Sequence, residues 1–392
     1  FSSVDGKISA SDSNAALLSF FARLNYDYKD RYLLSASIRR DESSKFYKDN
    51  RVGYFPSVSA GWNAHQESWF ANPVVSKLKI RASYGELGAN FLSPYNFDAI
   101  AYGPIPYTLG GVRYTSGRAA YLKSRELKWE TAKTTDIGLE LGFLNNDLTV
   151  QVDYFVKKNV DLLAQIDLNL SSGQIFEINS SREKPYVNSA SVKNTGWEFL
   201  VNYRKQLTKD FSIDATLNLS TLKNEVLSLG DNVQPITSGA MSSSFSDSPS
   251  ITKPGEAIGS FYGYKINGFD ADGNFIFADT DNSGSVDAND KVILGNPIPD
   301  FIYGLNLTMS YKDFDLTMFF QGVQGNEIFN QKKYTYYFDY SNNCVTDVLN
   351  AWTKNNQNTN IPIMKTQNTD GGNSLPSEFY IEDGSCLLYT SD

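Results

Sequence analysis

Hydrophobic and polar residues alternate along most of the chain. In residues 17–28 the even positions are apolar or aromatic, and the odd positions include Ser19, Arg23, Asn25 and Asp27. A period of two places successive side chains on opposite faces of an extended strand. The segment is therefore predicted to form a strand with one apolar face and one polar face.

The same alternation recurs in nine further segments. They cover residues 32–39, 53–62, 77–84, 136–143, 148–154, 197–203, 211–219, 301–311 and 314–320. Segment 53–62 contains Pro56, which cannot donate a hydrogen bond to a neighbouring strand. Most of these segments are longer than the usual globular strand of about 5 or 6 residues, and their length suits a tilted strand that crosses a bilayer.

The connections between these segments fall into two length classes. Short polar turns lie at 29–31, 145–146, 205–210 and 312–313, and long irregular segments lie at 41–52, 87–128, 159–188, 226–300 and 324–377. If strand direction alternates, all the short turns lie at one end. Short periplasmic turns and long extracellular loops are typical of outer-membrane barrels, whereas a soluble β-sandwich has shorter strands and loops that do not segregate by length. The predicted fold class is an all-β, transmembrane antiparallel β-barrel.

Composition limits the function. The 392 residues carry 35 Lys and Arg against 44 Asp and Glu, a formal charge of −9, so nucleic acid is not expected as a partner. A single His and two Cys exclude His-based triads, multi-His zinc sites and a disulfide framework. The mean hydropathy is −0.36 and no run of about 18 apolar residues occurs, which argues against a transmembrane helix but not against a barrel with a polar lumen.

Residues 279–290 have the ligand spacing of a calcium-binding loop. The candidate metal ligands are Asp279, Asp281, Ser283, Ser285, Asp287 and Asp290. They occupy loop positions 1, 3, 5, 7, 9 and 12, with Gly284 at position 6 for the sharp turn and the Ser285 backbone carbonyl at position 7. Asp replaces the usual Glu at position 12. Asp, Asn, Ser and Gly also favour an ordinary solvated turn, so a turn without metal is the alternative interpretation.

Aromatic residues crowd two of the long loops. Tyr102 and Tyr107 lie in one loop, and Tyr334, Tyr336 and Tyr337 lie in another. Tyrosine rings can stack on sugar faces or on peptide side chains while the phenol forms hydrogen bonds. These five residues are the candidate substrate contacts. An aromatic girdle or packing within the loops explains them equally well.

Several strings resemble one family of outer-membrane proteins. They are residues 20–44, FPSVSAGW at 55–62, LKIRASYG at 78–85, WET at 129–131, KNTGWE at 193–198, IGSFYGY at 258–264 and GNPIPDF at 295–301. In this order they are similar to the SusC/RagA-type TonB-dependent transporters. The resemblance implies roughly half of a 22-stranded barrel over residues 1–385, without the plug domain. Residues 386–392 depart from the family pattern and are predicted to be a non-native tail.

The resemblance also implies a function. It predicts nutrient import across the outer membrane of a Gram-negative bacterium, with oligosaccharides or peptides as substrates and no enzymatic activity. The expected partners are a SusD-like surface lipoprotein, the lipid bilayer, and the TonB–ExbB–ExbD complex acting through the N-terminal region that this sequence lacks. A secreted or surface-anchored β-rich adhesin or carbohydrate-binding protein is the alternative.

Overall fold

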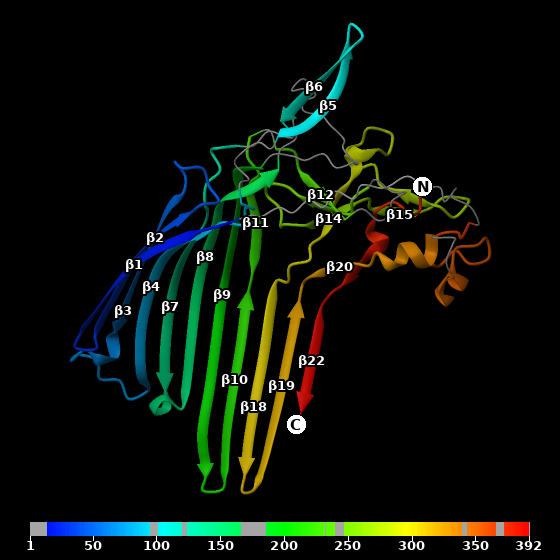
Figure 1. Cartoon of the computed structure of the whole chain (residues 1–392). Helices are drawn as coiled ribbons and strands as arrows, with labels where there is room; N and C mark the ends of the chain where they lie inside the picture. The colour runs from blue at the N-terminus through cyan, green and yellow to red at the C-terminus, as the bar shows by residue number, and fades with distance from the viewer. Residues whose placement is uncertain are drawn as a thin grey trace, which may run out of the picture.

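A large antiparallel sheet dominates the computed structural model, which describes residues 14–94, 101–119, 124–165, 186–231, 233–239, 247–338, 343–365 and 372–391. Figure 1 shows its strands side by side in the order β1-β2-β3-β4-β7-β8-β9-β10-β18-β19-β22, with β11 paired to β9. The bounds are β1 Leu17–Tyr28, β2 Tyr32–Ser43, β3 Val52–Asn63, β4 Val75–Ala89, β7 Glu130–Phe143, β8 Leu148–Gln165, β9 Tyr186–Thr208, β10 Phe211–Thr221, β11 Lys223–Ser228, β18 Phe301–Tyr311, β19 Phe314–Gln324 and β22 Cys386–Ser391. All ten predicted strands are confirmed.

The register keeps one residue type on each face of this sheet. One row of directly paired residues crosses six strands and consists of Leu34, Ala60, Ala82, Ile137, Tyr154 and Trp197. A row on the opposite face contains Lys79, Glu140 and Gln151. Since a slip of one residue would exchange the faces, the alternating sequence excludes that slip. In the predicted barrel the apolar face would be the lipid-facing wall and the polar face would line the lumen, and we name the two faces accordingly.

Short turns join the strands at one end of the sheet (Figure 1). In the turn between β1 and β2, Lys29 and Asp30 have φ angles of 55° and 54°, and the Asp27 carboxylate accepts a hydrogen bond from the Asp30 backbone N–H at 2.8 Å. Asp and Asn favour such turns because their short side chains bond to nearby backbone groups. The segregation of short turns to one end is as predicted.

The long loops at the other end contain further short elements. The strands are β5 Ala101–Leu109, β6 Val112–Ala119, β12 Ile236–Ser238, β13 Ser250–Thr252, β14 Ser260–Gly263, β15 Ile266–Phe269, β16 Phe275–Phe277, β17 Val292–Gly295, β20 Glu327–Phe329 and β21 Ile381–Asp383. The helices are η1 Ala64–Gln66, η2 Leu144–Asn146, η4 Ala288–Asp290, η5 Tyr334–Phe338, η6 Thr346–Asn350 and η7 Glu378–Tyr380, of which η1 and η2 lie in the turns. The prediction of irregular loops is therefore wrong in detail, because most of these strands are too short for alternation to be visible.

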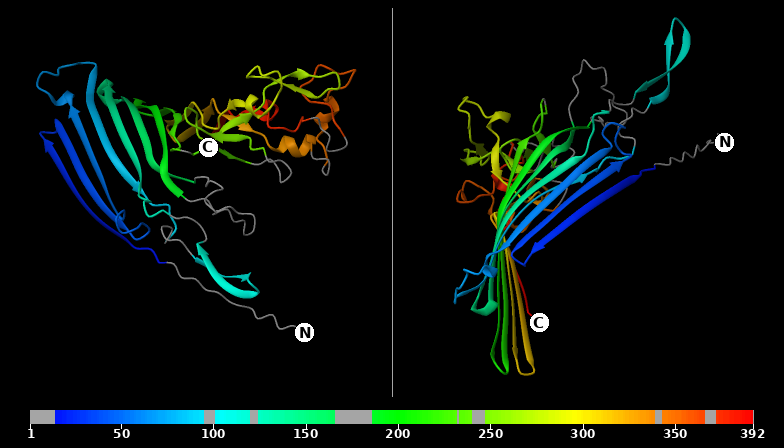
Figure 2. Two further views of the ribbon diagram at one scale, coloured as in Figure 1. Left: turned by 90° about the horizontal axis from the view of Figure 1, so that it is seen from above. Right: turned by 90° about the vertical axis from the view of Figure 1, so that its left-hand side faces the viewer.

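The sheet is a curved, open wall rather than a closed barrel in the part of the chain described (Figure 2). There β1 pairs with β2 alone, and β22 pairs with β19 alone. Residues 386–391, predicted as a non-native tail, continue the sheet as a strand, and Val323 pairs with Cys386. Their non-native origin stays a prediction.

Buried hydrophobic side chains gather toward the loop end of the sheet and not on its lipid-facing wall. Leu24 and Ile137 on the lipid-facing wall are 66% and 56% exposed, as expected of residues that contact lipid. Three small buried clusters instead lie toward the loop end, around Tyr380, Phe46 and Val226. None of the helices in the described ranges has the length and apolar character needed to span a membrane.

Candidate functional site

The acidic loop between β16 and β17 brings three carboxylates together. One carboxylate oxygen each of Asp279, Asp281 and Asp290 lies within 4.8 Å of the other two. Three like charges at this separation repel one another, and a divalent cation with oxygen ligands would relieve that repulsion. The chemistry of this donor set, all hard oxygen, fits Ca²⁺.

Backbone hydrogen bonds hold the loop in this shape. Asp290 is fully buried, and its carboxylate accepts the N–H groups of Thr280 at 2.6 Å and Asp287 at 2.7 Å. These bonds, that from Asp287 foremost, lower the pKa of Asp290 and keep it ionised. Asp279 accepts the N–H of Gly284 at 2.8 Å. Gly284 has a φ of +90°, which is the sharp turn that the sequence predicts at this position.

The remaining three candidates have local partners. Ser283 Oγ donates to the Ser285 carbonyl oxygen at 2.9 Å, so these two lie together on the exposed part of the loop. Asp287 accepts the N–H of Asn289 at 2.7 Å and caps η4. The structure thus gathers the carboxylates of positions 1, 3 and 12, while Asp287 at position 9 is engaged as a helix cap.

The predicted substrate tyrosines have different surroundings. Tyr102 and Tyr107 lie in β5, and their side chains are outside the described structure. Tyr336 is 38% exposed, whereas Tyr337 is 8% exposed within the buried cluster of the loops. Burial raises the pKa of the Tyr337 phenol. At Tyr337 the geometry therefore favours loop packing, the alternative explanation, over contact with a substrate.

That cluster joins distant segments into one folded layer. Tyr380 is fully buried, stacks on Phe329 with ring centroids 5.1 Å apart, and donates from its hydroxyl to the Ser374 carbonyl at 3.0 Å. The backbone N–H of Tyr264 bonds to the Pro376 carbonyl at 2.9 Å. These contacts join Tyr264 to Pro376 and Tyr380 to Phe329 and Ser374, so distant parts of the described loops pack together.

Sequence reasoning missed an ion-pair network on the lumen face. Arg81 of β4 reaches across β7 to Asp153 of β8, and its Nη2 lies 2.6 and 2.7 Å from the two carboxylate oxygens. Glu140 of β7 pairs with Lys77 at 2.8 Å and with Lys79 at 3.4 Å. The signal was present, since one segment carries the cations Lys77, Lys79 and Arg81 and the next two carry the carboxylates Glu140 and Asp153, but only the register shows which charges meet.

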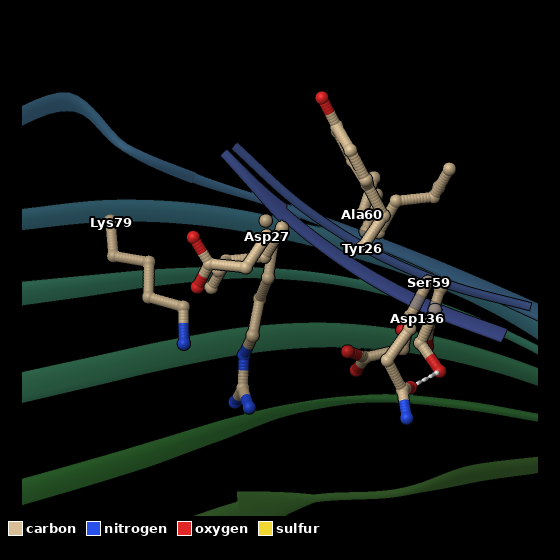
Figure 3. A pocket seen from close by; sticks show the side chains of 14 residues that line it. Tyr26, Asp27, Ser59, Ala60, Lys79 and Asp136 are labelled. Carbon is tan, nitrogen blue, oxygen red and sulfur yellow. Dashed lines mark hydrogen bonds between the residues drawn. The ribbon is translucent and has the colours of Figure 1, made fainter. Parts of the chain in front are cut away.

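A hollow of about 540 Å³ lies beside this network. Its polar lining includes Asn25, Ser59, Lys79 and Asp136. Figure 3 shows Lys79, Ser59 and Asp136 on one side of the strands, with Tyr26 pointing away from them. Carboxylate, ammonium, hydroxyl and amide groups here form a polar wall that can exchange hydrogen bonds with a hydrophilic solute.

Comparison of the sequence with known protein families identifies the family of this chain. The family described as "TonB dependent receptor-like, beta-barrel" matches residues 1–357. The chain belongs to the TonB-dependent receptor family. The predictions of a β-barrel fold and of a location in the outer membrane of a Gram-negative bacterium are thereby confirmed. A secreted or surface-anchored adhesin is no longer the alternative.

Curated relatives agree with this assignment. The chain is 33% identical over 392 residues to TonB-dependent receptor P26 of Formosa agariphila, with 95% of this chain and 38% of that protein covered. It is 30% identical over 387 residues to TonB-dependent receptor SusC of Bacteroides thetaiotaomicron, with 95% and 37% covered. The chain thus spans less than two-fifths of the length of these relatives. They are receptors and not enzymes, as expected.

The solved structures show the same fold. The RagAB peptide importer in its "open-open" state superposes with a TM-score of 0.78 at 23% identity, over 98% of this chain and 41% of that chain. A second RagAB structure, described as a peptide transporter, gives 0.76 at 23% identity over 98% and 42%. The resemblance to the SusC/RagA type is confirmed.

Proposed function

We propose that the protein imports oligosaccharides, with peptides as the second candidate substrate, together with a SusD-like surface lipoprotein and the TonB–ExbB–ExbD complex. The observation that carries this proposal is family membership combined with a polar lumen wall below a folded layer of loops. The SusC relative supports the assignment to the SusC type. Peptides remain a candidate substrate, because the RagAB structures are described as a peptide importer.

The chemistry of the wall supports a hydrophilic cargo. Sugars and peptides both form many hydrogen bonds, and the lumen face offers charged and hydroxyl groups rather than an apolar lining. The charged groups of the Arg81 network largely neutralise one another, so the wall would not select strongly for an anion or a cation. The barrel performs no covalent chemistry in this proposal.

A deletion strain tests the proposal. We expect loss of growth on at least one oligosaccharide supplied as sole carbon source, restored by the gene in trans, with unchanged growth on glucose. Loss confined to peptide media would overturn the preference for oligosaccharides. Unchanged growth on every oligosaccharide and peptide of the panel would overturn the import function.

We further propose that the acidic loop binds Ca²⁺ through Asp279, Asp281 and Asp290, with oxygen atoms of Ser283, Ser285 and Asp287 as additional ligands. Bound Ca²⁺ would neutralise the carboxylate cluster and clamp the connection between β16 and β17. Its role is structural, because the loop lies within the folded extracellular layer.

Isothermal titration of Ca²⁺ into chelator-treated folded protein tests this site. We expect binding heat in the wild type, and its loss in Asp279→Ala and Asp281→Ala. Asp313→Ala is the matched control, because it removes an exposed carboxylate from a short turn at the opposite end of the sheet. Equal heats in all four proteins would disprove the site.

A further inference from the structure

A second hollow lies on the other face of the same strands, the lipid-facing wall. It measures about 450 Å³ and is lined on this face by Tyr26, Tyr32, Leu34, Ala60, Trp62, Ile80 and Ala82. It is a depression in a surface that contacts the bilayer, since the chain is an outer-membrane barrel. It takes no part in the transport proposed above.

The register explains why the wall is hollow at this point. Ala60 of β3 pairs directly with Ala82 of β4, so two methyl side chains lie side by side. The next row toward the short turns pairs Trp62 with Ile80, and the next row in the other direction pairs Val58 with Tyr84. A patch of small residues is thus bordered by large ones, and the side chains leave a groove between them.

A polar network fixes the end of this groove that lies near the short turns. Two of its lining residues, Tyr32 and Trp62, donate hydrogen bonds to Glu67 Oε1 at 2.7 and 3.2 Å. Arg31 lies 3.5 Å from the other oxygen of Glu67. Both rings are therefore held in place by hydrogen bonds, as in the aromatic belt where a barrel meets the membrane interface.

We propose that this hollow is a binding site for one acyl chain of a phospholipid in the periplasmic leaflet, with the phosphate of that lipid beside Arg31 and Lys29. The apolar lining fits a hydrocarbon chain. At the short-turn end the exposed Lys29 offers its ammonium group to the phosphate, next to Arg31, which already pairs with Glu67. Lipopolysaccharide is the less suitable occupant, because it belongs to the opposite leaflet, at the end of the long loops.

The preference of an acyl chain for this groove over the surrounding lipid cannot come from the hydrophobic effect. Bulk lipid is as apolar as the groove, so moving a chain between them removes no apolar surface from water. Selectivity must arise from packing, because a chain seated between walls touches more atoms than one on a flat surface. About ten additional close carbon–carbon approaches suffice for a preference of roughly tenfold, which equals about 1.4 kcal/mol.

Photo-crosslinking in proteoliposomes tests the proposal. The protein in its natural length is reconstituted with phosphatidylethanolamine that carries a diazirine in one acyl chain, and modified peptides are mapped by mass spectrometry. We expect labelling of the segments around Tyr26 and Ala60 to exceed, by about tenfold, that around Leu217 and Leu305, which pair with each other elsewhere on the lipid-facing wall.

Variants that fill the groove sharpen the test. Ala60→Phe and Ala82→Phe should reduce this labelling to the level of the rest of the wall. Ala22→Phe adds the same ring to the apolar face of β1 outside the groove and should leave labelling unchanged. Heat-modifiable migration reports folding of each variant. Uniform labelling along the wall of the wild-type protein would overturn the proposal without any variant, as would labelling that Ala60→Phe leaves intact.

Discussion

Gly138 makes room for the ion pair between Arg81 and Asp153. It lies on β7 between the two strands that carry these residues, and a Cβ built on it would overlap both Asp153 Oδ1 and Arg81 Nε. The Gly138→Ala substitution must therefore push the guanidinium and the carboxylate apart. Gly85→Ala is the matched control, because its Cβ meets its nearest neighbour, Ser57 Cβ, at an ordinary 3.4 Å.

The size of the effect follows from the hydrogen bonds that this substitution breaks. Arg81 makes two charge-assisted hydrogen bonds to Asp153, whose side chain is only 10% exposed, while the Arg81 side chain is 38% exposed. A hydrogen bond to a charged group contributes about 1.5–3 kcal/mol. Because water reaches the guanidinium, we expect the whole pair to be worth about one such bond, so Gly138→Ala should destabilise the barrel by about 2 kcal/mol.

Urea unfolding of the detergent-folded protein, followed by tryptophan fluorescence, measures this difference. We expect a lower midpoint for Gly138→Ala and no loss for Gly85→Ala. The double variant Gly138→Ala with Arg81→Met should lose little more than Arg81→Met alone, because both changes remove the same interaction. Equal midpoints for Gly138→Ala and Gly85→Ala would refute the assignment of Gly138 as the space for this pair.

Three further predictions concern the loops. Because backbone N–H bonds hold the pKa of Asp290 below its ordinary value of 3.8, its ionised form stabilises the acidic loop fully above that pH, and this stabilisation is lost as the pH falls from there through the lower pKa of the folded state. Hydrogen exchange corrected for intrinsic rates should show the loop opening on acidification, and Asp290→Asn should show it at neutral pH. Tyr380→Ala should lower the free energy of unfolding of the loop layer by about 3–5 kcal/mol, and Tyr380→Phe, which loses the hydrogen bond to Ser374, should lower it by about 1 kcal/mol. Limited proteolysis of the loops measures both changes. Gly273→Ala should cost about 1–3 kcal/mol in the same assay, because Gly273 has a φ of +81° and its Cβ would overlap the Trp352 ring.

The strands of the wall could be predicted because each is long and has one apolar and one polar face. Alternation over seven or more residues identifies a strand and its two faces without any knowledge of its neighbours. The loop strands could not be predicted in this way. β14 and β17 have four residues each, and they are strands because the chain around them places them edge to edge.

Of the two candidate sites, one could be predicted from the sequence and the other needed the tertiary structure. The acidic loop is a local motif, so its ligand spacing is visible in twelve consecutive residues, and the structure gathers Asp279, Asp281 and Asp290 as that spacing predicts. The aromatic loop is different. Composition cannot distinguish Tyr336 from Tyr337, yet one is partly exposed and the other is buried. The difference arises because Tyr337 packs in a cluster with Ala351, Ile361 and Tyr380.

The sequence by itself determined the class of protein and the two faces of its wall, because a period of two and the contrast of short and long connections depend on local order alone. Tertiary structure decided which charges meet across the lumen face and where the lipid face is hollow. Arg81 and Asp153 are 72 residues apart in the sequence. Ala60 and Ala82 lie side by side only because β3 pairs with β4 in this register. Register is a relation between strands, and alternation within one strand cannot specify it.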